Sequence, residues 1–190
     1  MWGDTCYHRR PMQTRGHTLG NGKVLIIREA TPDDASSIVT FVEALSGQTD
    51  YLSFGPGEFG YNEAQERAFI RNCETSPNSL FLVAFIDDGL VGLLTFAGGE
   101  RPRHRHAGEL GLMVPKAYWG KGIGSRLVDT LIRWAEEGGV VTKLNLRVRT
   151  DNSRAIALYE RKGFVIEGEI TRSTVIGDEY FDSYWMGRGV

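Results

Sequence analysis

The sequence predicts an α/β (α+β) fold, a single domain with a mixed, mostly antiparallel sheet, helices on both faces and a central parallel pair of strands. Apolar runs of strand length and segments of helical period follow one another from Val24 to Met186. In the second half they alternate as strand, helix, strand and helix, an order that makes successive strands parallel. The 190 residues, 41% of them hydrophobic, suffice for one sizeable core.

The first elements are a strand and two helices. Residues 24–28 form an apolar run, and Thr31 and Pro32 then open a helix as its cap and first residue. We expect this helix to end near Gly47. Residues 48–61 are rich in glycine and aromatic residues, which predicts an ordered loop, and helical spacing resumes over residues 62–73.

A hairpin is predicted next. Residues 80–86 and 90–97 are apolar, and Asp87-Asp88-Gly89 between them is a turn signal. The two runs should therefore pair as antiparallel strands.

The second half continues with a strand over residues 108–114 and an amphipathic helix that ends at Gly138-Gly139. Residues 144–149 alternate between apolar and polar, as a strand with one buried face does. Asn152 or Ser153 caps the following helix. Residues 164–174 and 180–186 are predicted strands around the turn Gly177-Asp178.

Residues 1–23 show no apolar period, which predicts a disordered leader or a cloning remnant, so that residues 24–190 make up the domain. The net charge of −2 provides no basic surface for nucleic acid, and no apolar run approaches the roughly 18 residues that span a membrane. Cys6 and Cys73 lack CxxC spacing, which favours the cytoplasm and indicates neither a disulfide framework nor a metal site.

The first chemical motif lies between a strand and an amphipathic helix, where three glycines occur within residues 119–125. Glycine lets a ligand approach the backbone, and the free amides at a helix N-terminus bind phosphate. Tight packing alone could also explain the glycines. The stretch lacks the Walker GxxxxGK[ST] pattern and departs from the Rossmann GxGxxG spacing. An anion site in this stretch would therefore belong to a third class.

The second motif, residues 151–164 with the sequence DNSRAIALYERKGF, resembles the GNAT superfamily of N-acetyltransferases. That family combines an Arg/Gln-x-x-Gly-x-Gly/Ala pyrophosphate loop with a later N-x-x-A-x-x-L-Y-x-x-x-G-F signature. Both occur here in that order, and the resemblance covers about residues 24–186. The closing run GDEYFDSYWM is similar to the branch that holds ribosomal-protein and polyamine acetyltransferases. Trp119 is a departure, since it stands where the family usually has Arg or Gln.

The resemblance implies an acetyl-CoA-dependent N-acetyltransferase that needs no metal. It places the pantetheine arm along one strand, the diphosphate on the glycine loop, and a polar contact or cap at Asn152. Lys121, Arg126 and Arg154 are candidate partners of the CoA phosphates. The implied cofactor-binding residues are Leu112, Met113, Val114, Trp119, Gly120, Lys121, Gly122, Ile123, Gly124, Ser125, Asn152, Ala155 and Tyr159.

Attack of an amine on a thioester requires a neutral nitrogen. For an amine with a pKa near 10.4, losing the proton at pH 7 costs about 4 to 5 kcal/mol, so a base should contribute. The candidate is Glu109, where the family often places a glutamate. Its neighbours Leu110 and Leu112 suggest partial burial, which would make the carboxylate more basic. A solvent-facing glutamate is the alternative, and the loop residue His106 ranks second as base.

Tyr159 is the candidate acid, because a phenol can return a proton to a thiolate of comparable basicity, and a tyrosine at this motif position often does so in the family. The alternative is a core aromatic packed with Leu158 and Phe164. No covalent intermediate is required. A non-catalytic acyl-CoA sensor and a nucleotide-binding module are the competing functions.

The acceptor site is expected between the loop 48–61 and the last hairpin. Acidic side chains beside aromatic ones there would suit a cationic amine, either a small molecule or a protein N-terminus. The resemblance also allows a homodimer. The acids concerned are Asp50, Glu58, Asp178, Glu179 and Asp182.

Overall fold

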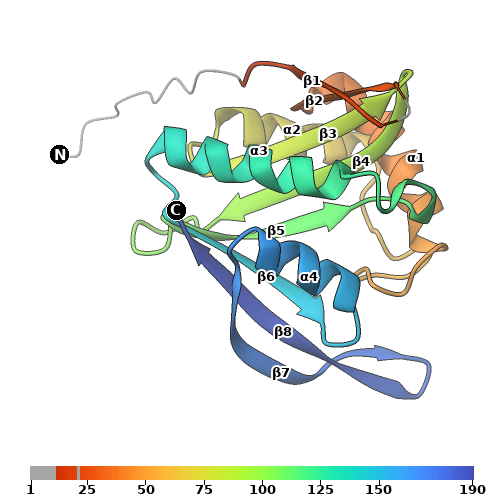
Figure 1. Cartoon of the computed structure of the whole chain (residues 1–190), viewed down its shortest axis with the longest axis vertical. Coiled ribbons are helices and arrows are strands. Elements are labelled where there is room, and N and C mark those ends of the chain that lie inside the picture. Colours follow the sequence, from red (N-terminus) through yellow and green to blue (C-terminus); the bar gives the residue numbers. More distant parts are fainter. Residues whose placement is uncertain (1–11, 21) are drawn as a thin grey trace.

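The computed structural model describes residues 12–20 and 22–190. These residues form one domain with a single sheet of eight strands and four α-helices (Figure 1). No helix in this part of the chain has the length and apolar content needed to cross a membrane. The elements are β1 Arg15–Thr18, β2 Val24–Glu29, α1 Ala35–Ser46, α2 Glu63–Thr75, β3 Ser79–Ile86, β4 Gly89–Gly98, β5 Ala107–Met113, α3 Ile123–Gly138, β6 Lys143–Arg149, α4 Ser153–Arg161, β7 Val165–Ile176 and β8 Glu179–Gly189.

The strand order is β1-β2-β3-β4-β5-β6-β8-β7, and every neighbouring pair is antiparallel except β5 and β6. The predicted mixed sheet with a central parallel pair is therefore confirmed. The parallel pairing covers only three residue pairs, the last of them Glu109 with Asn145. Beyond this pair β5 continues alongside β4 and β6 alongside β8, so the two strands separate.

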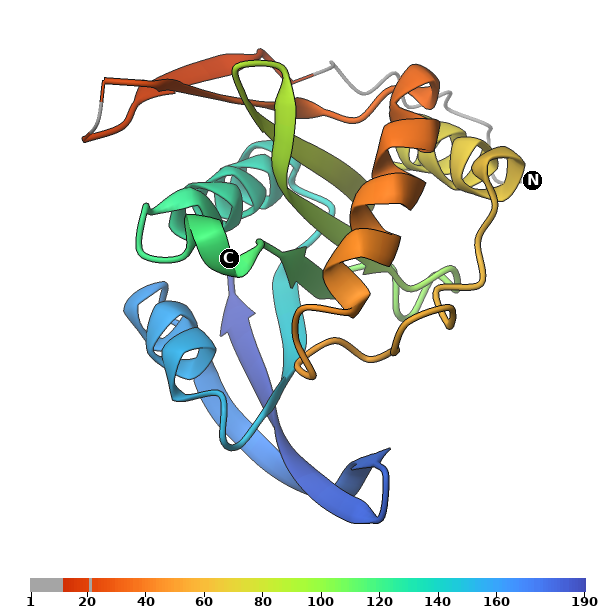
Figure 2. The ribbon, with the colours of Figure 1, turned by 90° about the vertical axis from the view of Figure 1, so that its right-hand side faces the viewer.

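Helices cover both faces of the sheet, as predicted. Figure 2 shows α3 and α4 on one side and α1 and α2 on the other. The alternation of side chains along β3 explains this arrangement, since Leu80 and Leu82 join the core beneath α3 while Phe81 and Val83 join the core beneath α1 and α2. The domain thus has two apolar cores, one on each face of the sheet.

The expectation that residues 1–23 lie outside the fold is wrong for the strand Arg15–Thr18. β1 pairs antiparallel with β2, with Gly16 opposite Ile26. Its sequence, RGHT, carries no apolar alternation, because a short edge strand buries little and is held by backbone hydrogen bonds to its neighbour. Residues 1–11 and 21 lie outside the described residues.

Glu66 is a buried carboxyl group on α2, with only 3% of its surface exposed. Desolvation raises its pKa to about 7 from the ordinary value of 4.5. Because the pKa of Glu66 is raised in the folded state, its contribution to the free energy of unfolding is fully present below pH 4.5. This contribution is lost as the pH rises towards 7. The loss amounts to at most about 3 kcal/mol.

We therefore expect Glu66→Gln to gain stability over the wild type as the pH rises from 5 to 8. Urea unfolding at several pH values measures the difference. Taking this difference at each pH cancels the titration of all other groups. A difference that stays constant from pH 5 to 8 would show that Glu66 ionises in the folded state as it does in the unfolded chain.

Candidate functional site

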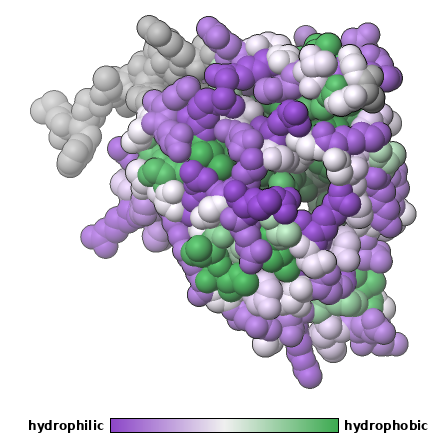
Figure 3. Space-filling view, in the orientation of Figure 1, coloured by the Kyte–Doolittle hydropathy of each residue, from purple (hydrophilic) through white to green (hydrophobic). Residues whose placement is uncertain are grey.

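A cavity of about 750 Å³ opens where β5 and β6 separate. Figure 3 shows a hollow on this face, with hydrophilic residues around its mouth and hydrophobic ones inside. The N-terminus of α3, α4, the loop after α1 and strand β7 complete its walls. The candidate base, the candidate acid and all the implied cofactor-binding residues except Lys121 line it, namely Glu109, Leu112, Met113, Val114, Trp119, Gly120, Gly122, Ile123, Gly124, Ser125, Asn152, Ala155 and Tyr159.

The separation of the strands leaves one edge of β5 open to the cavity. Leu110 to Met113 pair with β4 on the other edge, and no residue of β6 pairs with them. Their backbone groups on the open edge are free for a ligand. The resemblance assigns the pantetheine arm to this edge, and the geometry suits that assignment.

The glycine loop has the backbone that an anion cradle requires. Gly120 and Gly122 have φ of +76° and +78°, and Gly122 immediately precedes α3. A Cβ at Gly122 would collide with the Arg126 side chain, and a Cβ at Gly124 would stand 3.3 Å from Leu112. Glycine is therefore needed for the turn and for close packing of the helix on β5, while the first amides of α3 point to the cavity end of the helix.

Trp119, the departure from the family pattern, fixes the loop instead of presenting a charged group. Its indole Nε1 donates a hydrogen bond to the Val114 carbonyl at 2.7 Å. The Arg154 guanidinium lies 4.9 Å from the centroid of its ring. The tryptophan thus joins the loop to β5 and supports a cation beside the glycines.

The other two candidate phosphate partners lie at the glycine loop but outside the lining of the large cavity. Lys121 is exposed, and its ammonium stands 4.9 Å from the centroid of the Tyr118 ring. Arg126 lines a separate cavity of about 360 Å³ together with His17 and Arg133. Of the three basic residues, only Arg154 lines the large cavity.

Asn152 caps α4, because its Oδ1 accepts a hydrogen bond from the Ala155 amide at 3.2 Å. The predicted cap is confirmed. The residue also lines the cavity, so a contact with the cofactor stays a prediction.

Tyr159 is 7% exposed, and its ring meets that of Phe164 edge to face at 5.8 Å. Burial raises the pKa of its phenol, which keeps the proton on the oxygen. The residue also lines the cavity. Core packing and access to the site therefore occur together, and a role as proton donor stays a prediction.

Glu109 lines the cavity at the last residue of the parallel pairing. Its Oε1 accepts a hydrogen bond from Arg147 Nε on β6 at 2.8 Å, and 38% of its side-chain surface is exposed. The sequence did not indicate this partner. His106 is exposed and lies outside the cavity lining, so the geometry favours Glu109 as the base.

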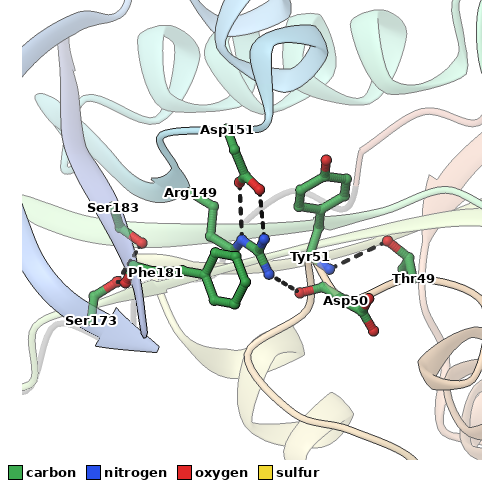
Figure 4. A network of polar contacts seen from close by, with 8 residues as sticks. All are labelled: Thr49, Asp50, Tyr51, Arg149, Asp151, Ser173, Phe181 and Ser183. Carbon is green, nitrogen blue, oxygen red and sulfur yellow. Dashed lines mark hydrogen bonds and ion pairs between the residues drawn. The ribbon is translucent and has the colours of Figure 1, made fainter. Parts of the chain in front are cut away.

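Arg149 is a site residue that the sequence reasoning missed. Its side chain is 9% exposed and makes two hydrogen bonds to Asp151, at 3.0 and 2.6 Å, and one to the Asp50 carbonyl at 3.0 Å (Figure 4). The Phe181 ring lies 3.7 Å from its Cζ and the Tyr51 ring 5.1 Å. The guanidinium lowers the pKa of Asp151. The sequence offered one signal for this residue: an arginine at the end of a buried strand, two residues before an aspartate.

The acids expected around the acceptor lie outside the cavity lining, which corrects the predicted acidic acceptor site. Some have other partners: the Glu58 carboxylate accepts from the Gly55 amide, and that of Asp182 from the Arg172 amide. The described residues also contain no group of three or more His, Cys, Asp or Glu placed to hold a metal ion. The wall here consists mainly of Thr49, Tyr51, Leu52, Ser53, Ser173, Thr174, Val175 and Ser183.

Comparisons with known proteins agree on one family. A family model described as the acetyltransferase (GNAT) family matches residues 46–164. The L-amino acid N-acetyltransferase of Escherichia coli is 36% identical over 107 residues, 56% of this chain and 66% of the relative. The E. coli ribosomal-protein-serine acetyltransferase is 28% identical over 103 residues, 54% of this chain and 56% of the relative. The chain thus matches less than two thirds of either relative.

Solved structures give the same result over more of the chain. A GNAT acetyltransferase from Streptococcus pneumoniae has a TM-score of 0.85 at 35% identity, over 87% of this chain and 99% of that one. A Salmonella typhimurium protein, solved with its cofactor acetyl-CoA, has a TM-score of 0.76 at 19% identity, over 87% of this chain and 93% of that one. The second likeness shows the fold alone.

Proposed function

Because the chain belongs to the acetyltransferase (GNAT) family, we propose that it transfers an acetyl group from acetyl-CoA to a primary amine by direct nucleophilic attack. The observation that carries the proposal is a single cavity that combines an open strand edge, a glycine loop at a helix N-terminus, Glu109 and Tyr159. The resemblance assigns each of these a role in acetyl transfer.

The cavity suits acetyl-CoA. The loop of Gly120 and Gly122 brings backbone amides and the positive end of the α3 dipole to one place, which fits a diphosphate. Arg154 adds a cation there, and the free edge of β5 offers hydrogen bonds to the amide groups of pantetheine. When bound, acetyl-CoA supplies the acetyl group as an activated thioester.

In this proposal Glu109 accepts, directly or through water, the proton that the ammonium form of the acceptor must lose. A carbon–nitrogen bond to the acetyl group forms and the carbon–sulfur bond breaks. The nitrogen, which is positively charged after the attack, gives up its second proton to solvent. The Tyr159 phenol donates its proton to the leaving sulfur, and solvent carries the proton from Glu109 to Tyr159. Arg147 holds the Glu109 carboxylate at the cavity wall through its hydrogen bond from Nε.

The acceptor is a small-molecule amine or a protein N-terminal amine. The names of the two E. coli relatives support both classes, an L-amino acid for one and a ribosomal protein for the other. A non-catalytic acyl-CoA sensor is the alternative, and it predicts binding without turnover.

We expect the purified protein to bind acetyl-CoA in preference to ATP and NAD, and to release free CoA when a suitable amine is added. A thiol reagent measures the release across polyamines, amino sugars, amino acids and N-terminal peptides, with acceptor-free mixtures as control. Saturable acetyl-CoA binding without release in any mixture would favour the sensor.

We also propose a cytoplasmic location and a homodimer. Cys6 and Cys73 lie far apart in the sequence and lack CxxC spacing, which suits a reducing compartment. Strand β7 is an edge strand that exposes Val165, Ile170 and Val175, which supports self-association through this face.

A further inference from the structure

The charges along the cavity wall favour an acceptor with an anionic group. Among the described lining residues there are four arginines, Arg147, Arg149, Arg154 and Arg161, and one carboxylate, Glu109. Arg147 is paired with Glu109 and Arg149 with Asp151, which leaves the charges of two arginines uncompensated within the described part of the chain. A polyamine would bring several positive charges into this cavity, where like charges repel. The lining therefore disfavours a polycation as acceptor.

Two of these arginines lie at the end of the cavity where the acceptor is expected to bind. Arg154 stands beside the glycine loop, since its Nη2 would lie 3.6 Å from a Cβ at Gly120. Arg147 and Arg149 lie on β6 instead, close to Glu109 and to the loop after α1. The cations on β6 thus flank the group that is proposed to take the proton from the amine.

Arg149 has donors left for a ligand. A guanidinium carries five N–H groups, and three of those of Arg149 bond to Asp151 and to the Asp50 carbonyl. Nη1 and Nη2 each keep one N–H without a hydrogen bond inside the described structure. The Phe181 ring and Asp151 hold the group in place, as Figure 4 shows, so it is fixed before a ligand arrives.

We propose that Arg149 binds a carboxylate of the acceptor, so that the substrates are small amines that carry a carboxylate close to the nitrogen, as free amino acids do. This inference rests on the proposed acetyl transfer. The fixed guanidinium selects one substrate class because it pairs with a carboxylate. Arg147 adds a second positive charge on the same strand.

The test compares kcat/KM for matched acceptors that differ only at the carboxyl group: L-phenylalanine, L-phenylalaninamide and L-phenylalaninol, with L-methionine and its amide as a second series and spermidine as a polycation. We expect the acids to exceed their amides and alcohols by about 10- to 100-fold. The amine of an amide loses its proton more readily, so amine basicity alone would favour the amide.

Arg149→Gln should reduce the acid-to-amide ratio to one or below, and Arg149→Lys should restore part of it, because the charge remains but the fork is lost. Because both kcat/KM values of a ratio are measured with the same variant, a general loss of activity from a disturbed loop cancels. Arg172→Gln, an exposed arginine outside the cavity lining, should keep the wild-type ratio.

Equal rates with acids and amides, or faster release with spermidine, would overturn the inference while leaving acetyl transfer established. An acid preference that survives Arg149→Gln would refute the assignment to this residue. Absence of CoA release with every amine would instead refute the proposed function, and this inference with it.

Discussion

Tyr159→Phe is expected to lower kcat by about 100-fold while acetyl-CoA binding stays close to that of the wild type. The substitution removes only the phenol oxygen of a residue that lines the cavity, and it keeps the ring that packs against Phe164. Burial raises the pKa of Tyr159, so the phenol stays protonated throughout the physiological range. For the same reason, ionisation of this group should not lower kcat below about pH 10.

Steady-state thiol release with a saturating amine measures kcat, and calorimetric titration measures acetyl-CoA binding. Tyr180→Phe is the matched control, since it removes the same atom from a tyrosine that is 60% exposed on β8. If both variants keep the wild-type kcat, Tyr159 is a core aromatic only, and the proton reaches the sulfur from water.

The helices and strands of the domain could be predicted because their signals are local. The capped helix after Thr31, the hairpin at Asp87-Asp88 and the alternation over Lys143–Arg149 each depend on residues close in sequence. Asp87 and Asp88 have φ of +48° and +61°, as the two central residues of a tight hairpin turn need. β1 was missed because an edge strand that buries few side chains leaves no apolar period.

The side of the site that is assigned to the cofactor was also predictable, since most of its residues lie within two continuous motifs. The acceptor side was not. It depends on contacts between distant segments, such as the bond from Arg149 to the Asp50 carbonyl and the ion pair of Arg147 with Glu109. The separation of β5 from β6 likewise follows from how β6 pairs with β8, which no single segment encodes.

Gly122→Val is expected to weaken acetyl-CoA binding by about 30-fold or more. Valine disfavours the φ of +78° at this position, so the loop must change shape and the first amides of α3 turn away from the diphosphate. Hydrogen bonds to a charged group contribute about 1.5 to 3 kcal/mol each, so the loss of one or two accounts for the change. The new side chain would also displace the flexible end of the Arg126 side chain, whose Nη1 donates a hydrogen bond to the Gly122 carbonyl.

Gly139→Val provides the matched control at the other end of the same helix. Gly139 has φ of +65°, and a Cβ there meets nothing within 4 Å, so the substitution adds similar backbone strain without touching the cavity. Thermal unfolding should show both variants destabilised by about 1 to 3 kcal/mol. Titration should show weaker acetyl-CoA binding for Gly122→Val alone. Equal affinities in the two variants would mean that strain in α3, and not the amides of the glycine loop, governs the cofactor site.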